Sequence, residues 1–237
     1  MKRIGMEKKI QLDWLDKLAF LYNDERDAKR IKEQMDGYLS DIIKGGESRR
    51  KHINVLMRIW VSVPEEDVSL RDQALQFLRK VKTEERLALH WGLCLLAYPL
   101  FRDVTTVIGR LLSLQDEITL AQVHKRIIES WGDRSSLNWA VQRLLRSLSL
   151  WGALKDTDVK GEYVAANKIV IENEELKLWL LECYLRCIDQ RTITYQSLIS
   201  APALFPFDIN VKLGELLTSD RFEVNRQGLD VDVVELR

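Results

Sequence analysis

The chain has little proline, glycine or cysteine: 4 Pro, 11 Gly and 3 Cys among 237 residues. Scarce glycine and proline argue against a loop-rich all-β protein and favour long helices. Three cysteines are too few for a disulfide-stapled secreted protein, so we expect a reducing, cytoplasmic setting. A net charge is also lacking, because the 36 Lys and Arg residues are balanced by 36 Asp and Glu residues. This balance excludes a polycation that coats nucleic acid or membrane indiscriminately.

No apolar run is long enough to cross a membrane. The most apolar stretch, Leu87 to Phe101, has about 15 residues, whereas a spanning helix needs roughly 20. It contains His90 and Pro99, and we expect a buried core helix there. The first ten residues are charged and lack the apolar core of an export signal, so we expect no export.

Enzyme motifs are missing. The chain has no phosphate-binding loop, no dinucleotide-binding glycine pattern and no nucleophile elbow. Cys183 and Cys187 are four residues apart and share a helix face, but no second ligand pair completes a zinc site. His52, His90 and His124 are isolated from one another. We therefore expect reduced cysteines, no metal, no cofactor and no catalysis.

Apolar residues recur at helical spacing through the first hundred residues, which predicts a helical N-terminal region over 1–101. One long segment is expected over 24–44, ended by Gly45 and Gly46. Its predicted buried stripe consists of Ile31, Met35, Tyr38, Leu39 and Ile42. The N-caps predicted for the next three helices are Ser48, Ser69 and Thr83.

Three further helices and a hairpin are predicted over 102–168. Asp103 is expected to cap the first helix and Thr119 the second, which ends at Trp131 and Gly132. After a turn at 132–134, a third helix runs from about Ser135 to Leu150. Two short extended pieces around a polar, Gly-containing turn at 156–161 then predict the hairpin.

This order of elements resembles the winged helix-turn-helix superfamily. The resemblance covers about a quarter of the chain and includes the phrase Leu-Ser-Leu-Trp-Gly-Ala-Leu at 148–154, which is similar to the join between recognition helix and wing in that superfamily. It implies that the third helix reads DNA, or that the unit docks onto a protein.

The remaining residues, 169–237, predict a C-terminal helix-plus-hairpin unit, for which a second, degenerate winged helix is an alternative. A helix is expected over 173–188, and strands over 221–225 and 229–233. Residues 172–237 carry 7 Lys and Arg against 12 Asp and Glu. This acidity argues against phosphate contact and favours a structural or protein-binding role. The expected fold class is thus mainly α.

Candidate DNA contacts lie on the third helix of the 102–168 unit. Asn, Gln and Arg side chains can form paired hydrogen bonds with base edges, and spacings of three, four and four place such residues on one stripe. Trp139 lies beside the stripe; we expect it to pack, with stacking on a base as the alternative. The predicted stripe is Ser135, Asn138, Gln142 and Arg146, and the predicted phosphate contacts are Arg134, Arg143, Lys125, Arg126, Lys155 and Lys160.

A second basic cluster, Arg49, Arg50 and Lys51, opposes the dipole at a helix start, which hints at a phosphate partner. Ordinary solvated surface residues would show the same pattern, both in this cluster and on the third helix. We expect a non-catalytic protein that binds double-stranded DNA, as a regulator or an accessory subunit of a DNA-processing or phage-defence system, and a homodimer if its site is palindromic. The alternative is a docking subunit of a larger complex that touches no DNA and binds protein through its acidic C-terminal unit.

Overall fold

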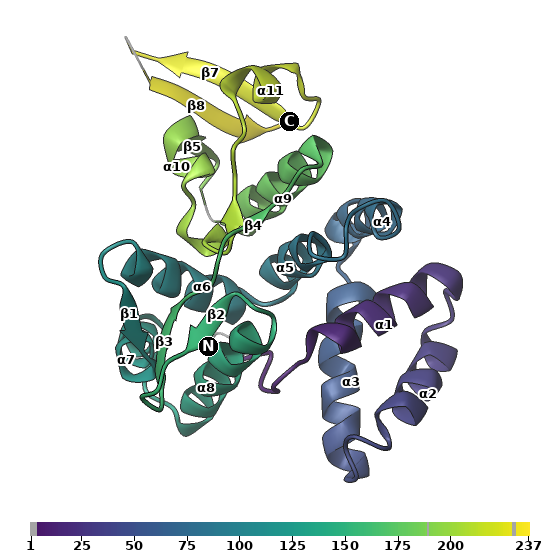
Figure 1. Cartoon of the computed structure of the whole chain (residues 1–237). Coiled ribbons are helices and arrows are strands. Elements are labelled where there is room, and N and C mark those ends of the chain that lie inside the picture. Colours follow the sequence, from purple (N-terminus) through teal and green to yellow (C-terminus); the bar gives the residue numbers. More distant parts are fainter. Residues whose placement is uncertain (1–3, 189, 229–230) are drawn as a thin grey trace.

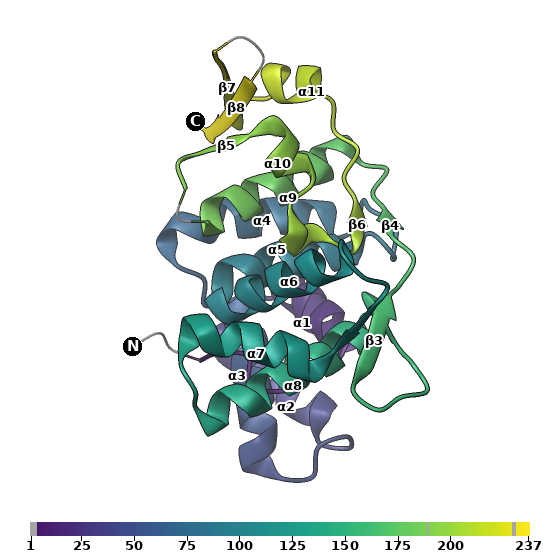
Figure 2. The ribbon, with the colours of Figure 1, turned by 90° about the vertical axis from the view of Figure 1, so that its left-hand side faces the viewer.

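The computed structural model describes residues 4–188, 190–228 and 231–237. Helices account for 58% of the residues, and the strands form small sheets of two or three, which confirms the mainly α prediction. Figures 1 and 2 show the helices α4, α5 and α6 across the middle, the C-terminal unit on one side of them and α7 and α8 on the other.

The N-terminal region is helical, as predicted, but its helices are shorter than their apolar periodicity suggested. Asp27 caps α2 by accepting hydrogen bonds from the backbone N–H groups of Lys29 and Arg30, so the expected 24–44 helix does not exist as one element. Ile42 lies beyond the end of α2 and is 51% exposed. The elements are α1 (Leu12–Asp24), α2 (Ala28–Leu39), α3 (Gly46–Trp60), a 3-10 turn (Glu65–Asp67), α4 (Val68–Phe77) and α5 (Arg86–Ala97).

Four cap predictions were wrong. The N-cap positions of α3, α4 and α5 are Gly45, Asp67 and Glu85, so Ser48, Ser69 and Thr83 do not occupy them. Asp103 lies inside a helix that begins at Pro99. Proline suits this first position, because the N–H that it lacks would have no partner within the helix. The boundary predicted between residues 101 and 102 therefore falls within this helix.

The middle unit matches the predicted order of helices and hairpin and adds one strand. Thr119 caps α7, with Gln122 completing a capping box. The strand that sequence reasoning missed, β1, pairs antiparallel with β3, so the sheet has the order β1-β3-β2. The elements are α6 (Pro99–Leu112), β1 (Glu117–Thr119), α7 (Leu120–Trp131), α8 (Ser135–Leu150), β2 (Leu154–Asp156) and β3 (Glu162–Ala165).

The C-terminal unit contains the predicted helix and hairpin and repeats the arrangement of the middle unit. In both units a helix and a strand are followed by two helices and a hairpin, and the first strand pairs with the last: here the order is β5-β8-β7. The C-terminal unit differs in that a 3-10 turn and the strand β6 lie between its two helices. Leu229 and Asp230 of the predicted second strand lie outside the described residues. The elements are β4 (Ile169–Val170), α9 (Glu174–Cys187), β5 (Thr192–Thr194), α10 (Tyr195–Ile199), a 3-10 turn (Pro202–Leu204), β6 (Phe207–Asp208), α11 (Leu213–Thr218), β7 (Phe222–Gln227) and β8 (Val231–Leu236).

One core joins the three predicted ranges, and Trp91 of α5 lies at its centre. The Trp91 indole N–H donates to the carbonyl of Ala203 at 2.9 Å. Its ring makes edge contacts with Phe101 and Trp151 of the middle unit and with two C-terminal phenylalanines, with ring centroids 5.0 to 6.3 Å apart. Among the described residues, no single helix meets the length and apolarity of a membrane span; α5 and α6 do so only as a pair bent by 118°.

Candidate nucleic-acid interface

Helix α8 presents the predicted polar stripe outward. Gly132, with φ of 75°, allows the tight turn that separates α8 from α7. The helix buries Leu137, Val141 and Leu144 completely, and this fixes which face remains in solvent. The stripe residues Ser135, Asn138, Gln142 and Arg146 are all exposed.

The hairpin loop, residues 157–161 between β2 and β3, flanks one side of α8. The backbone N–H of Leu120 donates to the carbonyl of Gly161 at 2.8 Å, which ties the base of the loop to the start of α7. Val159 and Lys160 are exposed on this loop, and Lys155 is exposed on β2. Lys160 therefore lies on the hairpin side of the stripe. Lys155 precedes Asp156, whose carboxylate binds Arg146 of α8, so strand alternation points Lys155 to the other face of the hairpin.

The N-terminal strap, residues 4–11, crosses the other side of α8. Ser147 accepts a hydrogen bond from the backbone N–H of Ile10 at 2.9 Å, and Trp151 donates to the Ile10 carbonyl at 3.0 Å. Arg143 donates to the carbonyl of Glu7 at 2.7 Å. Sequence reasoning missed this contact, because nothing local relates residues more than 130 positions apart.

The strap brings together three cations from distant parts of the sequence: Lys8, Lys51 of α3 and Arg143 of α8. Burial, followed by the positive charges of Arg143 and Lys51, lowers the pKa of Lys8. Burial also lowers the pKa of His52, as do Lys8, Arg143 and Lys9 to a smaller extent. We call Lys8, Lys51 and Arg143 the cationic cluster; Glu47 partly offsets it through an ion pair with Lys51 at 2.7 Å.

A hollow of about 540 Å³ opens between α7, α8 and the hairpin loop. Trp139 of α8 lines it and is 58% exposed, so the expectation that this indole packs was wrong. Position 139 lies at the edge of the buried face of α8, and the described residues leave most of its indole in solvent. The other lining residues are Thr119, Leu120, Ala121, His124, Asn138, Gln142, Val159, Lys160, Gly161 and Glu162.

Two predicted DNA contacts hold the fold together. Arg49 is only 17% exposed and binds Asp36 through two hydrogen bonds of 2.6 and 3.1 Å, which joins α2 to α3. Arg146 binds Asp156 of β2 at 2.7 and 2.8 Å. Hydrogen bonding from Ser149, followed by the charge of Arg146, lowers the pKa of Asp156. Arg146 therefore anchors the hairpin to α8.

The structure does not bring the other predicted contacts together on one face. Arg134 donates to the carbonyl of Trp131 at 3.1 Å, and Lys125 and Arg50 are exposed. Arg126 lines a different hollow, of about 660 Å³ between α6, α7 and α9. That hollow has mixed charge, because Asp103 and Glu129 line it along with the arginines Arg102, Arg110 and Arg126.

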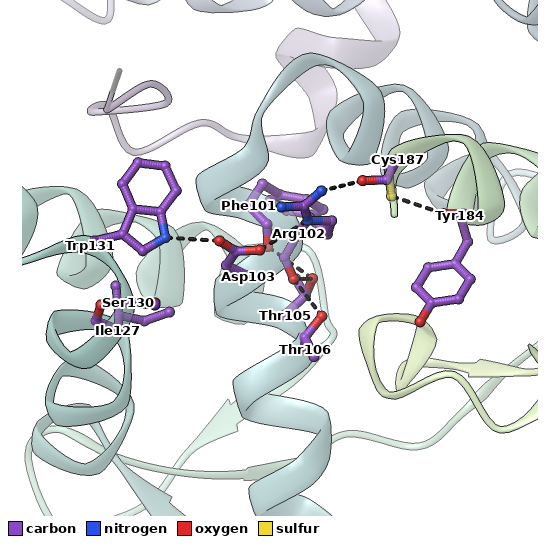
Figure 3. A network of polar contacts seen from close by, with 10 residues as sticks. All are labelled: Phe101, Arg102, Asp103, Thr105, Thr106, Ile127, Ser130, Trp131, Tyr184 and Cys187. Carbon is purple, nitrogen blue, oxygen red and sulfur yellow. Dashed lines mark hydrogen bonds and ion pairs between the residues drawn. The ribbon is translucent and has the colours of Figure 1, made fainter. Parts of the chain in front are cut away.

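A network of polar contacts borders this second hollow and fixes α6 against α7 and α9 (Figure 3). Asp103 accepts hydrogen bonds from the indole N–H of Trp131 at 2.8 Å and from Arg102 at 2.9 Å. Arg102 also donates to the carbonyl of Cys187. Each charged group drawn in the network has a partner within the protein, which marks it as structural.

The described residues contain no group of three His, Cys, Asp or Glu side chains that could hold a metal ion. Burial raises the pKa of the thiols of Cys94 and Cys183, which disfavours the thiolate that binds metals. Cys187 is half-buried and donates to the carbonyl of Tyr184 at 3.1 Å.

Comparison with known proteins found no matching family model, no matching curated protein and no matching solved structure.

Proposed function

We propose that the chain is a non-catalytic DNA-binding protein and that residues 99–165 form a winged helix-turn-helix. The order of α6, β1, α7, α8 and the hairpin, with strands in the order β1-β3-β2, supports this assignment. In this proposal α8 is the recognition helix and the hairpin loop is the wing. The protein would act as a regulator or as an accessory subunit of a DNA-processing or phage-defence system.

The observation that carries the proposal is the placement of cations on both sides of α8. The cationic cluster flanks the helix on the side of the strap, and Lys160 flanks it on the side of the wing. Phosphate contacts on two sides position a nucleic acid, and the side chains between them read it. The charge is thus concentrated locally on a molecule whose net charge is zero.

Asn138 and Gln142 are the proposed base-reading residues. Both are exposed in the middle of α8, and their amides can pair with the acceptor and donor of an adenine edge. Arg146 is assigned a positioning role, because Asp156 already holds its guanidinium. A palindromic site would require a homodimer.

The test is a fluorescence-anisotropy titration of the parent protein and the double variant Lys8→Ala, Lys51→Ala against random duplex DNA. The parent should bind at about 50 mM salt and lose most of its affinity by about 200 mM. The double variant should bind more weakly, and its slope of log affinity against log salt should fall by about 2.

The matched control is Lys29→Ala, Lys32→Ala, which removes two exposed lysines from α2. It should bind like the parent. Absence of binding by the parent at low salt, or equal binding by both double variants, would refute the proposal.

One observation favours protein docking as a second candidate. The acidic C-terminal unit exposes Leu217 of α11 and Val231 of β8, at 53% and 46%. An apolar contact made through these residues would be insensitive to salt, in contrast to phosphate binding.

A further inference from the structure

Trp139 is an outlier among the tryptophans. All seven lie within the described ranges, and the other six are at most 6% exposed. Tryptophan is usually well buried, because removing its large apolar surface from water is favourable. An indole 58% exposed beside a hollow therefore suits contact with a ligand.

The indole stands between two hollows. On one side is a hollow of about 220 Å³ lined by Glu7, Ser136 and Arg143, and the Arg143 guanidinium lies 5.8 Å from the indole centroid. The other side borders the 540 Å³ hollow. A cation near one face of an aromatic ring leaves the opposite face available for stacking.

The larger hollow combines apolar walls with a polar rim. Leu120, Ala121 and Val159 supply apolar surface, and Val159 is 59% exposed on the wing. The amides of Asn138 and Gln142 lie on the same lining. The volume falls within the roughly 300–1,000 Å³ typical of small-ligand sites. A flat apolar group with a polar edge matches this lining.

The surrounding charge decides between a nucleobase and an apolar protein side chain. Lys160 lines the hollow itself, the Arg143 guanidinium lies 5.8 Å from the indole centroid, and Lys8 and Lys51 lie near Arg143 on the side of the strap. Glu162 balances Lys160 on the larger lining, and Glu7 lines the smaller hollow together with Arg143. The excess of positive charge near Trp139 therefore comes from Lys8 and Lys51, the latter partly offset by Glu47. A base carried on a phosphodiester strand satisfies both the aromatic wall and the cations on either side.

We infer that the hollow beside Trp139 receives an unpaired base, so that the preferred ligand is DNA with a single-stranded segment, such as a fork. A base inside a duplex has both faces stacked on its neighbours, whereas an unpaired base can stack on an exposed aromatic ring. This inference rests on the proposed DNA-binding function and narrows the class of ligand.

Intrinsic fluorescence offers a direct test. Because the other six tryptophans are buried, emission that acrylamide quenches comes mainly from Trp139. Quenching should be measured with and without three ligands: a 20-residue thymine oligonucleotide, a blunt duplex, and the same duplex with a single-stranded fork. The single strand and the fork should shield Trp139, and the blunt duplex should not. Trp139→Phe, which lacks the quenchable emission, gives the background.

Affinities for the same three ligands supply the second readout. Trp139→Ala should weaken binding of the single strand and the fork by about tenfold or more and leave the blunt duplex unchanged. Trp139→Phe keeps a stacking face and should retain most of the affinity. The matched control, Leu114→Ala, removes another exposed apolar side chain, 83% exposed, and should bind like the parent. Circular dichroism checks that each variant is folded.

The outcomes separate this inference from the proposed function. Salt-sensitive duplex binding, with Trp139 unshielded by every ligand and Trp139→Ala equal to the parent, would overturn the unpaired-base site and leave DNA binding intact. Absence of binding to all three ligands at low salt would overturn both. Shielding by single strand and fork, lost affinity in Trp139→Ala and recovery in Trp139→Phe would establish the site.

Discussion

His52 is the residue that connects the cationic cluster to the stability of the fold. Its Nδ1 donates to the carbonyl of Ser48 at 2.8 Å, and its ring meets the edge of Trp14 at a centroid distance of 5.7 Å. Burial, and then the charges of Lys8, Arg143 and Lys9, lower its pKa below the usual 6.5. The unfolded chain therefore takes up a proton at a higher pH than the folded protein does.

This difference predicts how stability changes with pH. Above pH 6.5 His52 is neutral in both states and favours neither; as the pH falls below 6.5 the unfolded state is protonated first, so the free energy of unfolding falls. Urea unfolding of the parent and of His52→Gln at pH 7.5 and 5.5 measures the effect. The parent should lose more stability on acidification than the variant, and equal losses would contradict the assignment.

Trp139 illustrates what sequence reasoning could and could not supply at a single residue. Helical spacing placed Asn138 and Gln142 on an exposed stripe, and both are exposed. The same spacing left Trp139 beside the stripe, where its burial depended on whether another element covers it. Only the tertiary structure shows that the described part of the chain leaves most of the indole uncovered, and the expectation from residue type alone was wrong.

At the scale of elements, the contact between α6 and the 3-10 turn at 202–204 depends on the absence of a side chain. A Cβ built on Gly109 would lie 2.0 Å from the carbonyl oxygen of Pro202, and a backbone atom cannot move aside as a flexible side chain can. Gly109→Ala should therefore lower the free energy of unfolding by about 1–3 kcal/mol, the usual cost of overpacking, despite the better helix propensity of alanine.

Gly37 in α2 provides the matched control. Nothing lies within 4 Å of a Cβ built there, so Gly37→Ala should raise stability by up to about 1 kcal/mol. Thermal unfolding of both variants compares the two effects. A stabilised Gly109→Ala protein would show that α6 and the turn at 202–204 are not in close contact.

The elements that sequence predicted best are those whose signals are local. Thr119 and Gln122 form a capping box within four residues, and α7 begins where that motif indicates. The strand Glu117–Thr119 was missed because three residues carry no periodicity and the strand exists only through its pairing with β3. The strap on α8 was missed for the same reason: its hydrogen bonds to Ser147 and Trp151 join opposite halves of the chain.

At the scale of the whole molecule, the predicted ranges 1–101, 102–168 and 169–237 share one core. Trp91, in the first range, contacts aromatic rings of the other two ranges, and Glu85 adds a second connection to the third range. The Glu85 carboxylate accepts hydrogen bonds from the backbone N–H groups of Glu172, at 2.6 Å, and Asn173, at 3.3 Å, at the start of α9. A carboxylate is favourable there because it faces the positive end of the helix dipole. We therefore expect the C-terminal unit to unfold together with the rest.

Trp91→Phe tests this coupling. The smaller ring leaves a void and removes the hydrogen bond to the carbonyl of Ala203, so the free energy of unfolding should fall by about 2–4 kcal/mol. Trp139→Phe makes the same substitution at an exposed position and should change it by less than about 0.5 kcal/mol. Urea unfolding followed by far-UV circular dichroism and by tryptophan fluorescence should give coincident transitions in the parent and a shared shift to lower urea in Trp91→Phe. Two separated transitions, with only one moved by Trp91→Phe, would show that the ranges are energetically independent. Parts that pack into one core unfold in a single cooperative transition, so a substitution that destabilises the core must shift the unfolding of every part.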